Sequence, residues 1–346
     1  MNTIHVLVDN CVSSEKSYAQ AVDFLNNSEV VAFPTETVYG LGAVATDEEA
    51  VKKIFAAKER PSDNPLIVHI GSIEEVALYI EEVPEVAQQC MEAFWPGPLT
   101  IVMQAKPNIL AESVTAGLGT VGLRMPNHPV ALELLRELKK PLAAPSANRS
   151  GKPSPTKASH VAEDLDGIIP CILDGGSTGI GLESTVLDVT TDKPVILRPG
   201  GVTKEMLEAV IGRPVLQSMH TEHKQDTTPK APGMKYTHYA PEAPVYLIEP
   251  NQKVIEAIKQ LQAEGHRVAL IAPQSFANSG AEYFFTYGKD GDTNAMSAGL
   301  YDALRACDKT DATIILATVT EAQGVGVAIM NRLEKAAGGK WYSNND

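Results

Sequence analysis

A hydroxyl-rich stretch directly after a short apolar run is the part of this sequence best suited to hold a ligand. The run Val30–Phe33 predicts a buried strand, and Pro34-Thr35-Glu36-Thr37-Val38-Tyr39-Gly40-Leu41-Gly42 follows it. Pro34 has no N–H to donate, so it ends strand pairing, and the two glycines predict a turn that approaches a ligand closely. Asp47 is predicted to cap the next helix, whose buried face would be Ala50, Val51, Ile54 and Phe55, and Lys58 and Arg60 fall where that helix ends. Hydroxyls beside a Lys-x-Arg pair suit an anionic ligand such as a phosphate; an ordinary turn with solvated charges is the alternative.

Two further polar loops also follow predicted strands. The apolar segment 141–144 precedes Pro145–Thr156, which is rich in hydroxyl, glycine and basic residues. The strand 184–189 is predicted to form a hairpin with Val195–Arg198, and Arg198 ends the partner strand. Because ligands of α/β folds gather at strand-end loops, these segments are candidates for the same site, and Arg198 is a candidate phosphate ligand.

Two polar residues lie inside predicted strands. Arg124 interrupts the apolar segment 121–126, and a buried arginine needs a partner because an unpaired buried charge is very costly. That partner is either an internal carboxylate or a substrate carboxylate held by two hydrogen bonds. His69 lies near the end of the apolar segment 65–70, where a histidine is more often a core or edge residue than a catalytic one.

Composition narrows the class of protein. The chain has 346 residues, 44% hydrophobic and 21% charged, which is typical of a globular protein with two or three domains. A formal net charge of −14 argues against broad non-specific binding of nucleic acid. The basic residues that matter occur singly inside turn motifs, which favours a small phosphorylated ligand.

Targeting and cysteine signals point to a cytoplasmic protein. No apolar run approaches the length of a membrane span, and residues 1–9 contain no basic n-region of a signal peptide. We therefore expect a cytoplasmic location. The four cysteines are scattered without a Cys-x-x-Cys pair, which favours buried free thiols over zinc ligands or disulfides. They are Cys11, Cys90, Cys171 and Cys307.

The predicted elements divide the chain into three parts. Strands and helices alternate up to about residue 215 and predict an α/β domain over 1–215. Residues 216–242 lack an apolar period and predict a linker, although its aromatic segment 232–241 could dock as a lid. Strands and helices alternate again over 243–346, which predicts a small open parallel sheet.

Taken in order, the motifs resemble those of one known family, the YrdC-like domain. The matching motifs are Pro34–Gly42, Lys58-x-Arg60-Pro61, Asn64-Pro65-Leu66, Trp95-Pro96-Gly97-Pro98-Leu99-Thr100, Ser146-Ala147-Asn148, and Ser184-Thr185-Val186 with Arg198-Pro199-Gly200. The segment Pro232-Gly233-Met234-x-Tyr236-x-His238-Tyr239-x-Pro241 and the trailing α/β part resemble the longer, Sua5-type version. The resemblance covers nearly the whole chain.

The resemblance implies both a fold and an activity. The fold is a twisted open α/β sheet with a positively charged concave cavity, joined to a smaller Rossmann-like parallel α/β domain. The activity is L-threonylcarbamoyl-adenylate synthesis, in which L-threonine, bicarbonate and ATP give threonylcarbamoyl-AMP and pyrophosphate. A partner complex, a tRNA threonylcarbamoyl-transferase, then uses the product to make the t6A base at position 37 of tRNAs. Such a nucleotidyltransferase needs no protein nucleophile, because positioning and charge stabilisation suffice.

The resemblance also implies roles for individual residues. Lys58 and Arg60 would be the catalytic residues that hold the triphosphate. Further ATP contacts would come from Asn64, Thr120, Ser146, Asn148, Ser154, Arg198 and Tyr239. The threonine pocket would consist of Thr35, His69, Arg124, Ala144 through its backbone, and Ser184. Mg²⁺ would bind through the phosphates, without a cage of side-chain ligands.

Two other functions are alternatives to this one. An RNA-binding or ribosome-maturation module could use a basic concavity, but the acidic net charge argues against it and makes direct tRNA binding doubtful. Carbamoyl transfer of the hydrogenase-maturation kind would come with an acylphosphatase domain and zinc-finger cysteine pairs, and the sequence shows neither.

Overall fold

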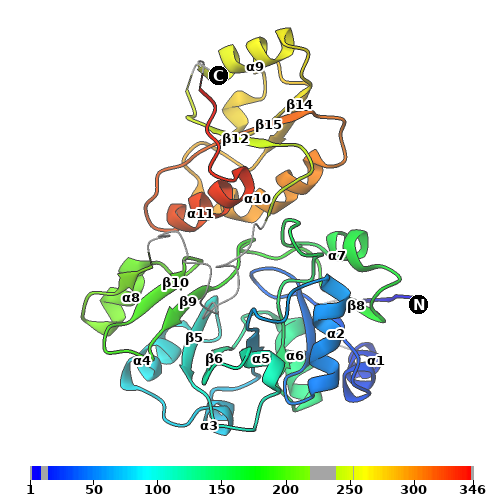
Figure 1. Cartoon of the computed structure of the whole chain (residues 1–346), viewed down its shortest axis with the longest axis vertical. Coiled ribbons are helices and arrows are strands. Elements are labelled where there is room, and N and C mark those ends of the chain that lie inside the picture. The colour runs from blue at the N-terminus through cyan, green and yellow to red at the C-terminus, as the bar shows by residue number, and fades with distance from the viewer. Residues whose placement is uncertain (1, 9–14, 219–238, 252, 344–346) are drawn as a thin grey trace. The chain divides into compact units, whose positions relative to one another are not determined.

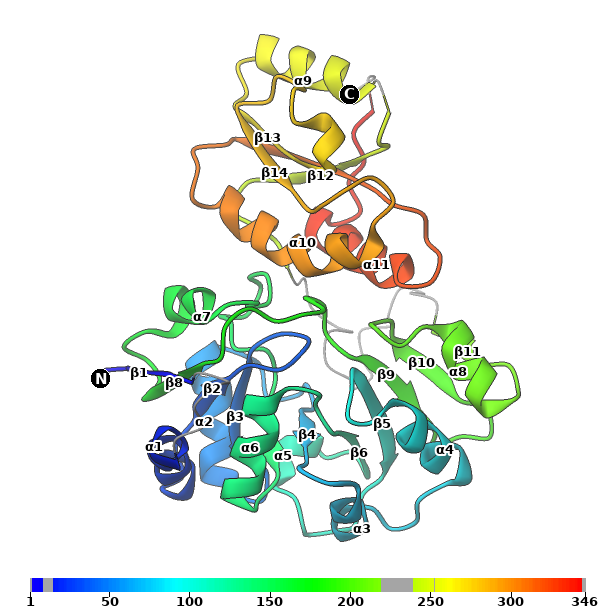
Figure 2. The same ribbon diagram turned by 180° about the vertical axis from the view of Figure 1, so that it is seen from behind.

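The computed structural model describes residues 2–8, 15–218, 239–251 and 253–343 (Figures 1 and 2). The chain divides into two compact units. The first comprises Met1–Ser150, Pro155–Gly179 and Glu183–Lys235, and the second comprises Gly151–Ser154, Ile180–Leu182 and Tyr236–Asp346. Within these described segments, no helix combines the length and the apolar character that crossing a membrane requires.

The first unit is built on a mixed sheet of 11 strands in the order β1-β8-β2-β3-β7-β4-β6-β5-β9-β10-β11. The strands are β1 (Ile4–Leu7), β2 (Val31–Phe33), β3 (Gly40–Val44), β4 (Ile67–His69), β5 (Leu99–Gln104), β6 (Thr120–Arg124), β7 (Leu142–Ala143), β8 (Cys171–Asp174), β9 (Thr185–Asp188), β10 (Val195–Arg198) and β11 (Leu216–Gln217). Strand neighbours in space are mostly not neighbours in sequence, so the sheet brings distant segments together.

Helices cover both faces of this sheet. They are α1 (Glu15–Asn26), α2 (Glu48–Lys58), α3 (Val76–Tyr79), α4 (Glu85–Phe94), α5 (Glu112–Thr115), α6 (Pro129–Leu138), α7 (Ala158–Leu165) and α8 (Lys204–Ile211), with a 3₁₀ turn η1 (Ile73–Glu75). One face packs on α2, α4, α7 and α8 through a large apolar cluster. On the other face, α1 and α6 cover β2, β3, β7 and β8. Beyond α1 and α6, this second face continues over β4, β5 and β9 with a small separate cluster of Ile67, Val102 and Val186.

Helix α2 shows how local chemistry places a functional side chain. Asp47 caps its first turn by accepting hydrogen bonds from the backbone N–H groups of Glu49 and Ala50, as the sequence predicted. The helix ends at Lys58, and Glu59 adopts a left-handed conformation with φ of 51°. The side chain of Lys58 is therefore held in the last turn, where it is buried.

Gly40 and Gly42 lie inside β3, so the predicted turn at these glycines was wrong. Gly40 of β3 pairs with Phe33 of the antiparallel strand β2, and the chain reverses its direction over the residues between them. The glycines instead make room for the ring of Phe33. A Cβ atom on Gly42 would lie 2.7 Å from Cε1 of that ring. Side-chain packing, rather than backbone freedom, requires glycine at this position.

Replacing Gly42 with alanine should therefore destabilise the protein. We expect the free energy of unfolding in urea to fall by about 1–3 kcal/mol, because the added methyl group overpacks the core against Phe33. Gly179→Ala is the matched control, since nothing lies within 4 Å of its added Cβ. Equal stability of the two variants would contradict this account of β3.

The second unit contains a sheet of four parallel strands in the order β12-β15-β13-β14. Its elements are β12 (Val245–Ile248), α9 (Lys253–Ala263), β13 (Val268–Ala272), η2 (Gln274–Phe276), β14 (Tyr283–Thr286), α10 (Thr293–Cys307), β15 (Ile314–Thr318) and α11 (Gly326–Ala337). The predicted small parallel α/β sheet is confirmed. Within this unit Tyr239 stacks on Tyr301, with ring centroids 5.2 Å apart.

The remaining element predictions are largely confirmed. Strands β9 and β10 form the expected antiparallel hairpin. Three cysteines, Cys90, Cys171 and Cys307, are buried free thiols, and Cys11 lies outside the described residues. Sequence reasoning missed β1, β3, α5, α7 and β11, whose stretches are short or contain polar residues or glycines that weaken the apolar pattern. Strand β11 lies at the start of the segment that was predicted to be a linker.

Candidate active site on the sheet of the first unit

Several predicted residues converge on one face of the first unit's sheet. Side chains alternate along a strand, so residues two apart point to the same side. The strand register places His69 beside Arg124 and Val102 opposite Gly122. We call this surface the β4–β9 face. Its residues are Ile67, His69, Thr100, Val102, Gly122, Arg124 and Val186.

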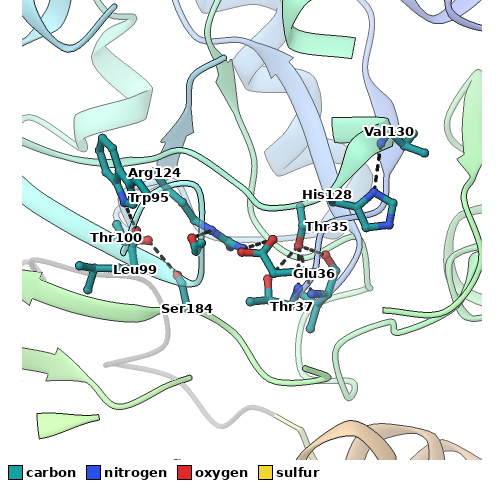
Figure 3. A network of polar contacts seen from close by, with 12 residues as sticks. Thr35, Glu36, Thr37, Trp95, Leu99, Thr100, Arg124, His128, Val130 and Ser184 are labelled. Atoms are coloured by element: carbon teal, nitrogen blue, oxygen red, sulfur yellow. Dashed lines mark hydrogen bonds and ion pairs between the residues drawn. The ribbon is translucent and has the colours of Figure 1, made fainter. Parts of the chain in front are cut away.

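Arg124 ends β6, and its side chain is buried, with 4% of the residue exposed. Its Nε donates to the carbonyl oxygen of Gly97 at 3.3 Å, and its Nη2 lies 2.8 Å from Oε2 of Glu36 (Figure 3). Glu36 is itself only 9% exposed. Of the two partners that the sequence allowed for Arg124, the internal carboxylate is present.

The turn that carries Glu36 is shaped by threonine hydroxyls. Thr35 Oγ1 donates to the carbonyl oxygen of Val38 at 2.7 Å and accepts from the backbone N–H of Val38 at 3.2 Å. It also lies 2.8 Å from Oγ1 of Thr37. Thr35 is 2% exposed. Its hydroxyl thus holds the turn that places Glu36 against Arg124.

Ser184 connects the start of β9 to two other strands. Its hydroxyl shares a 2.8 Å hydrogen bond with Thr100 of β5. Arg198, at the end of β10, donates from Nε and Nη2 to the carbonyl oxygen of Ser184 at 3.1 and 3.0 Å. The same Nη2 lies 3.2 Å from the Ser184 hydroxyl. All three residues are buried, so Arg198 is held in a fixed orientation beside the β4–β9 face.

His69 is a neutral imidazole in this setting. Burial, assisted by the positive charge of Arg124, lowers its pKa to about 3. Its ring lies edge-on to Phe33, with centroids 6.1 Å apart. Its Nδ1 has no hydrogen-bond partner among the described residues. A neutral ring with an unused polar atom suits hydrogen bonding to a ligand better than attraction of an anion.

The lowered pKa of His69 makes stability depend on pH. The unfolded chain, with a histidine pKa near 6.5, binds more protons than the folded chain between about pH 3 and 6.5. The free energy of unfolding should therefore fall as the pH drops through this window, by up to about 1.4 kcal/mol per pH unit. His69→Gln should lose this component in urea unfolding between pH 4.5 and 7, whereas His5→Gln, at an exposed position, should keep it. Identical slopes for wild type and His69→Gln would contradict the assignment.

Lys58, Ser146 and Asn148 form a second polar cluster in the same unit. Lys58 is 2% exposed, and its Nζ donates to the carbonyl oxygens of Ser146 at 2.5 Å and Asn148 at 2.6 Å. The Ser146 hydroxyl donates to Oδ1 of Asn148 at 2.6 Å. The structure thus brings together three of the residues that the resemblance assigned to ATP. The ammonium group also fixes the loop after β7.

Asn64 carries a buried amide that the protein does not satisfy. The residue is 1% exposed, and neither Nδ2 nor Oδ1 has a hydrogen-bond partner among the described residues. Nη2 of Arg60 lies 3.5 Å from the Asn64 carbonyl oxygen. Buried side-chain amides are nearly always paired, so this one is a sign of a polar ligand or an ordered water.

The other predicted site residues either lie away from these two clusters or already form hydrogen bonds within the protein. Thr120 begins β6 and points to the same side as Arg124, but it lies about 13 Å away along the strand. It adjoins Gly119, which helps to line a separate pocket of about 490 Å³. The backbone N–H of Ala144 donates to Ile67 at 2.9 Å. Ser154 and Tyr239 belong to the second unit. Tyr236 and His238 of the predicted lid lie outside the described residues.

Sequence reasoning missed Glu36 and Thr100 as partners in this site. Glu36 was visible as the one acidic residue in a motif of hydroxyl, glycine and apolar residues. Thr100 ends the motif Trp95–Thr100, but a threonine in a strand is ordinary, so nothing in the sequence indicated that it pairs with Ser184. Within the part of the chain that the structure describes, no cluster of three or more His, Cys, Asp or Glu side chains could hold a metal ion.

Comparison with known proteins identifies the family. The model of the Sua5/yciO/yrdC family, described as "Telomere recombination", matches residues 23–200, and the model described as "Threonylcarbamoyl-AMP synthase, C-terminal domain" matches residues 202–338. A threonylcarbamoyl-AMP synthase of Bacillus subtilis is 51% identical over 96% of this chain and 96% of its own length. This chain belongs to the Sua5/YciO/YrdC family. It contains both domains of the Sua5 type.

A relative from Pyrococcus abyssi agrees with this chain in sequence and in structure. A threonylcarbamoyl-AMP synthase of Pyrococcus abyssi is 50% identical over 92% of this chain and 93% of its own length. The crystal structure of P. abyssi Sua5 complexed with L-threonine superposes with a TM-score of 0.92 and 46% identity. It covers 98% of this chain and 99% of that chain. The expected fold, a YrdC-like α/β sheet followed by a smaller parallel α/β domain, is therefore confirmed.

Proposed function

We propose that this protein is a threonylcarbamoyl-AMP synthase, which condenses L-threonine, bicarbonate and ATP and releases pyrophosphate. The observation that carries the proposal is the 51% sequence identity, over nearly the full length of both chains, to a synthase of that name. The structure adds a buried site whose polar groups suit the substrates. In this reaction the amine nitrogen of threonine bonds to the carbon of bicarbonate, and a water molecule is lost to give a carbamate. A carbamate oxygen then attacks the α-phosphorus of ATP, and pyrophosphate leaves.

The cluster at the end of α2 is the proposed triphosphate site. Lys58 and Arg60 supply positive charge, and Asn64 supplies an amide that has no hydrogen-bond partner among the described residues. Ser146 and Asn148 place a hydroxyl and an amide beside the Lys58 ammonium group. Fixed cations next to a transferring phosphoryl group stabilise the charge that develops as pyrophosphate leaves, and they need no reorganisation during the reaction. Ser154, Thr120, Arg198 and Tyr239 are proposed as further nucleotide contacts.

The β4–β9 face is the proposed amino-acid site. Arg124 is the residue suited to the threonine carboxylate, because a guanidinium group binds a carboxylate with two parallel hydrogen bonds. His69, neutral and with a free Nδ1, lies beside it and can hydrogen-bond the substrate. Thr35, Ser184 and the Ala144 backbone complete the proposed pocket. The apolar side chains of Ile67, Val102 and Val186 reduce access of water, which protects a labile carbamate.

The residues present fit a magnesium ion that is held mainly by the substrate. Mg²⁺ prefers oxygen ligands and commonly binds through one or two protein groups and the phosphates of a nucleotide. The proposed triphosphate site offers neutral oxygens of Ser146 and Asn148, and the described residues contain no acidic cluster that could hold a metal ion by itself. When bound, the ion would neutralise charge on the phosphate oxygens.

As cellular context we propose a cytoplasmic location and transfer of the product to a tRNA threonylcarbamoyl-transferase complex.

Pyrophosphate release from ATP by the purified protein tests the proposal. We expect release that requires both L-threonine and bicarbonate, with Mg²⁺ present. Release that ignores threonine would indicate a different acceptor or a simple ATPase. No release from protein that binds ATP would instead favour a binding module, and tRNA binding over a series of salt concentrations would then be measured.

A further inference from the structure

Glu36 and Arg124 are close and oppositely charged, yet they do not satisfy each other. Nη2 of Arg124 lies 2.8 Å from Oε2 of Glu36. Both carboxylate oxygens of Glu36 and this Nη2 are nevertheless buried without a hydrogen-bond partner among the described residues. The contact is thus an ion pair without hydrogen-bond alignment (Figure 3). A buried ion pair is stable only when further hydrogen bonds satisfy its remaining polar atoms. Glu36 and Arg124 both have such unsatisfied atoms, so both can form hydrogen bonds to a third partner.

Among the described residues, the two histidines beside the pair do not provide a second cation for Glu36. Burial lowers the pKa of His128, although the charge of Glu36 acts in the opposite direction. His128 also uses Nδ1 to accept from the backbone N–H of Val130 at 3.2 Å. His69 is neutral, with a pKa of about 3. Arg124 is thus the cation that the structure places against Glu36, and both Glu36 oxygens can still accept hydrogen bonds from a bound molecule.

An α-amino-acid zwitterion has the complementary arrangement of charges. Its carboxylate and its ammonium group are attached to the same carbon, and they stand as close together as the charges of the Glu36–Arg124 pair. With the carboxylate on Arg124, the ammonium group lies within reach of Glu36 and can donate the hydrogen bonds that its oxygens lack. Charge-assisted hydrogen bonds of this kind are strong where water is excluded.

We propose that Glu36 binds the α-ammonium group of the amino-acid substrate. The inference rests on the proposed function, in which Arg124 receives the carboxylate. It makes the turn after β2 part of the substrate site, with Thr35 and Thr37 holding the turn in shape. It also explains why an acidic residue stands in a motif that otherwise binds through hydroxyls: recognition of an amino acid needs an anion and a cation side by side.

Calorimetric binding of two ligands to the full-length protein tests the proposal. The ligands are L-threonine and 3-hydroxybutanoate, which has the same skeleton without the amino group. Wild type should bind L-threonine about 10- to 100-fold more tightly, as expected for a hydrogen bond between charged groups. Glu36→Gln should remove this preference by weakening threonine alone, with 3-hydroxybutanoate changed less than about twofold. Glu92→Gln makes the same chemical change at an exposed position and should preserve the preference.

The outcomes separate this proposal from simpler ones. Equal affinity of wild type for both ligands would overturn it without any variant, so the test stands even if Glu36→Gln fails to fold. Parallel weakening of both ligands in Glu36→Gln would mean that Glu36 acts only by orienting Arg124, which also overturns it. The proposed function is judged by a different result, threonine-dependent pyrophosphate release by wild type, and can hold while the role of Glu36 fails.

Discussion

Lys58→Ala is expected to lower the rate of pyrophosphate release at saturating substrates by about 10²- to 10³-fold, the usual effect of removing one preorganised electrostatic contact to a transition state. The buried Nζ has two effects in the structure. It brings a positive charge to the proposed triphosphate site, and it donates to the carbonyl oxygens of Ser146 and Asn148. Its loss removes the charge and releases the loop after β7. Kinetic assays with varied ATP separate the effect on kcat from that on KM.

Two variants serve as controls for this prediction. Lys52→Ala removes a lysine from the same helix, where its Nζ lies 3.7 Å from Glu48 Oε1 and 60% of the side chain is exposed, so activity should stay near that of wild type. Lys58→Arg keeps the charge but cannot reproduce the compact ammonium geometry, so we expect partial activity. Near-normal release by Lys58→Ala would remove Lys58 from the catalytic role.

Arg124→Met is expected to lower both stability and threonine binding. Removing the guanidinium group leaves the Glu36 carboxylate buried without a counter-ion, which typically costs about 3–5 kcal/mol in the free energy of unfolding. Methionine fills much of the vacated volume, so the loss reports mainly on charge. Urea unfolding measures the stability, and calorimetry measures binding of L-threonine, which should fall below detection.

A double variant separates the two effects of Arg124. Arg124→Met combined with Glu36→Gln removes both charges, so a large part of the lost stability should return, because a neutral pair is tolerated in a buried site. Threonine binding should stay absent, since the carboxylate still lacks its arginine. If Arg124→Met were as stable as wild type, the ion pair would not matter to the fold. Recovery of threonine binding in the double variant would place the carboxylate elsewhere.

Predictions from local pattern succeeded where neighbouring residues decide the outcome. The Asp47 cap and the apolar spacing of Ala50, Val51 and Ile54 specify α2 within one short segment. The alternation of strands and helices over the last hundred residues similarly specified a small parallel sheet. Gly42 shows the limit of such reasoning. Glycine is required there because a larger side chain would collide with the ring of Phe33, and not because the backbone needs an unusual conformation.

The sequence by itself predicted a set of candidate ligand residues and showed that Arg124, inside an apolar strand, needs a partner for its charge. It could not determine that Glu36 is that counter-ion, that Thr100 meets Ser184, or that the Lys58 ammonium group holds the loop of Ser146. Each pair joins segments that only the strand order of the sheet makes adjacent. The physical reason is that backbone propensity acts over a few residues, whereas a buried charge or hydroxyl is satisfied by whichever group the tertiary fold places within hydrogen-bond distance.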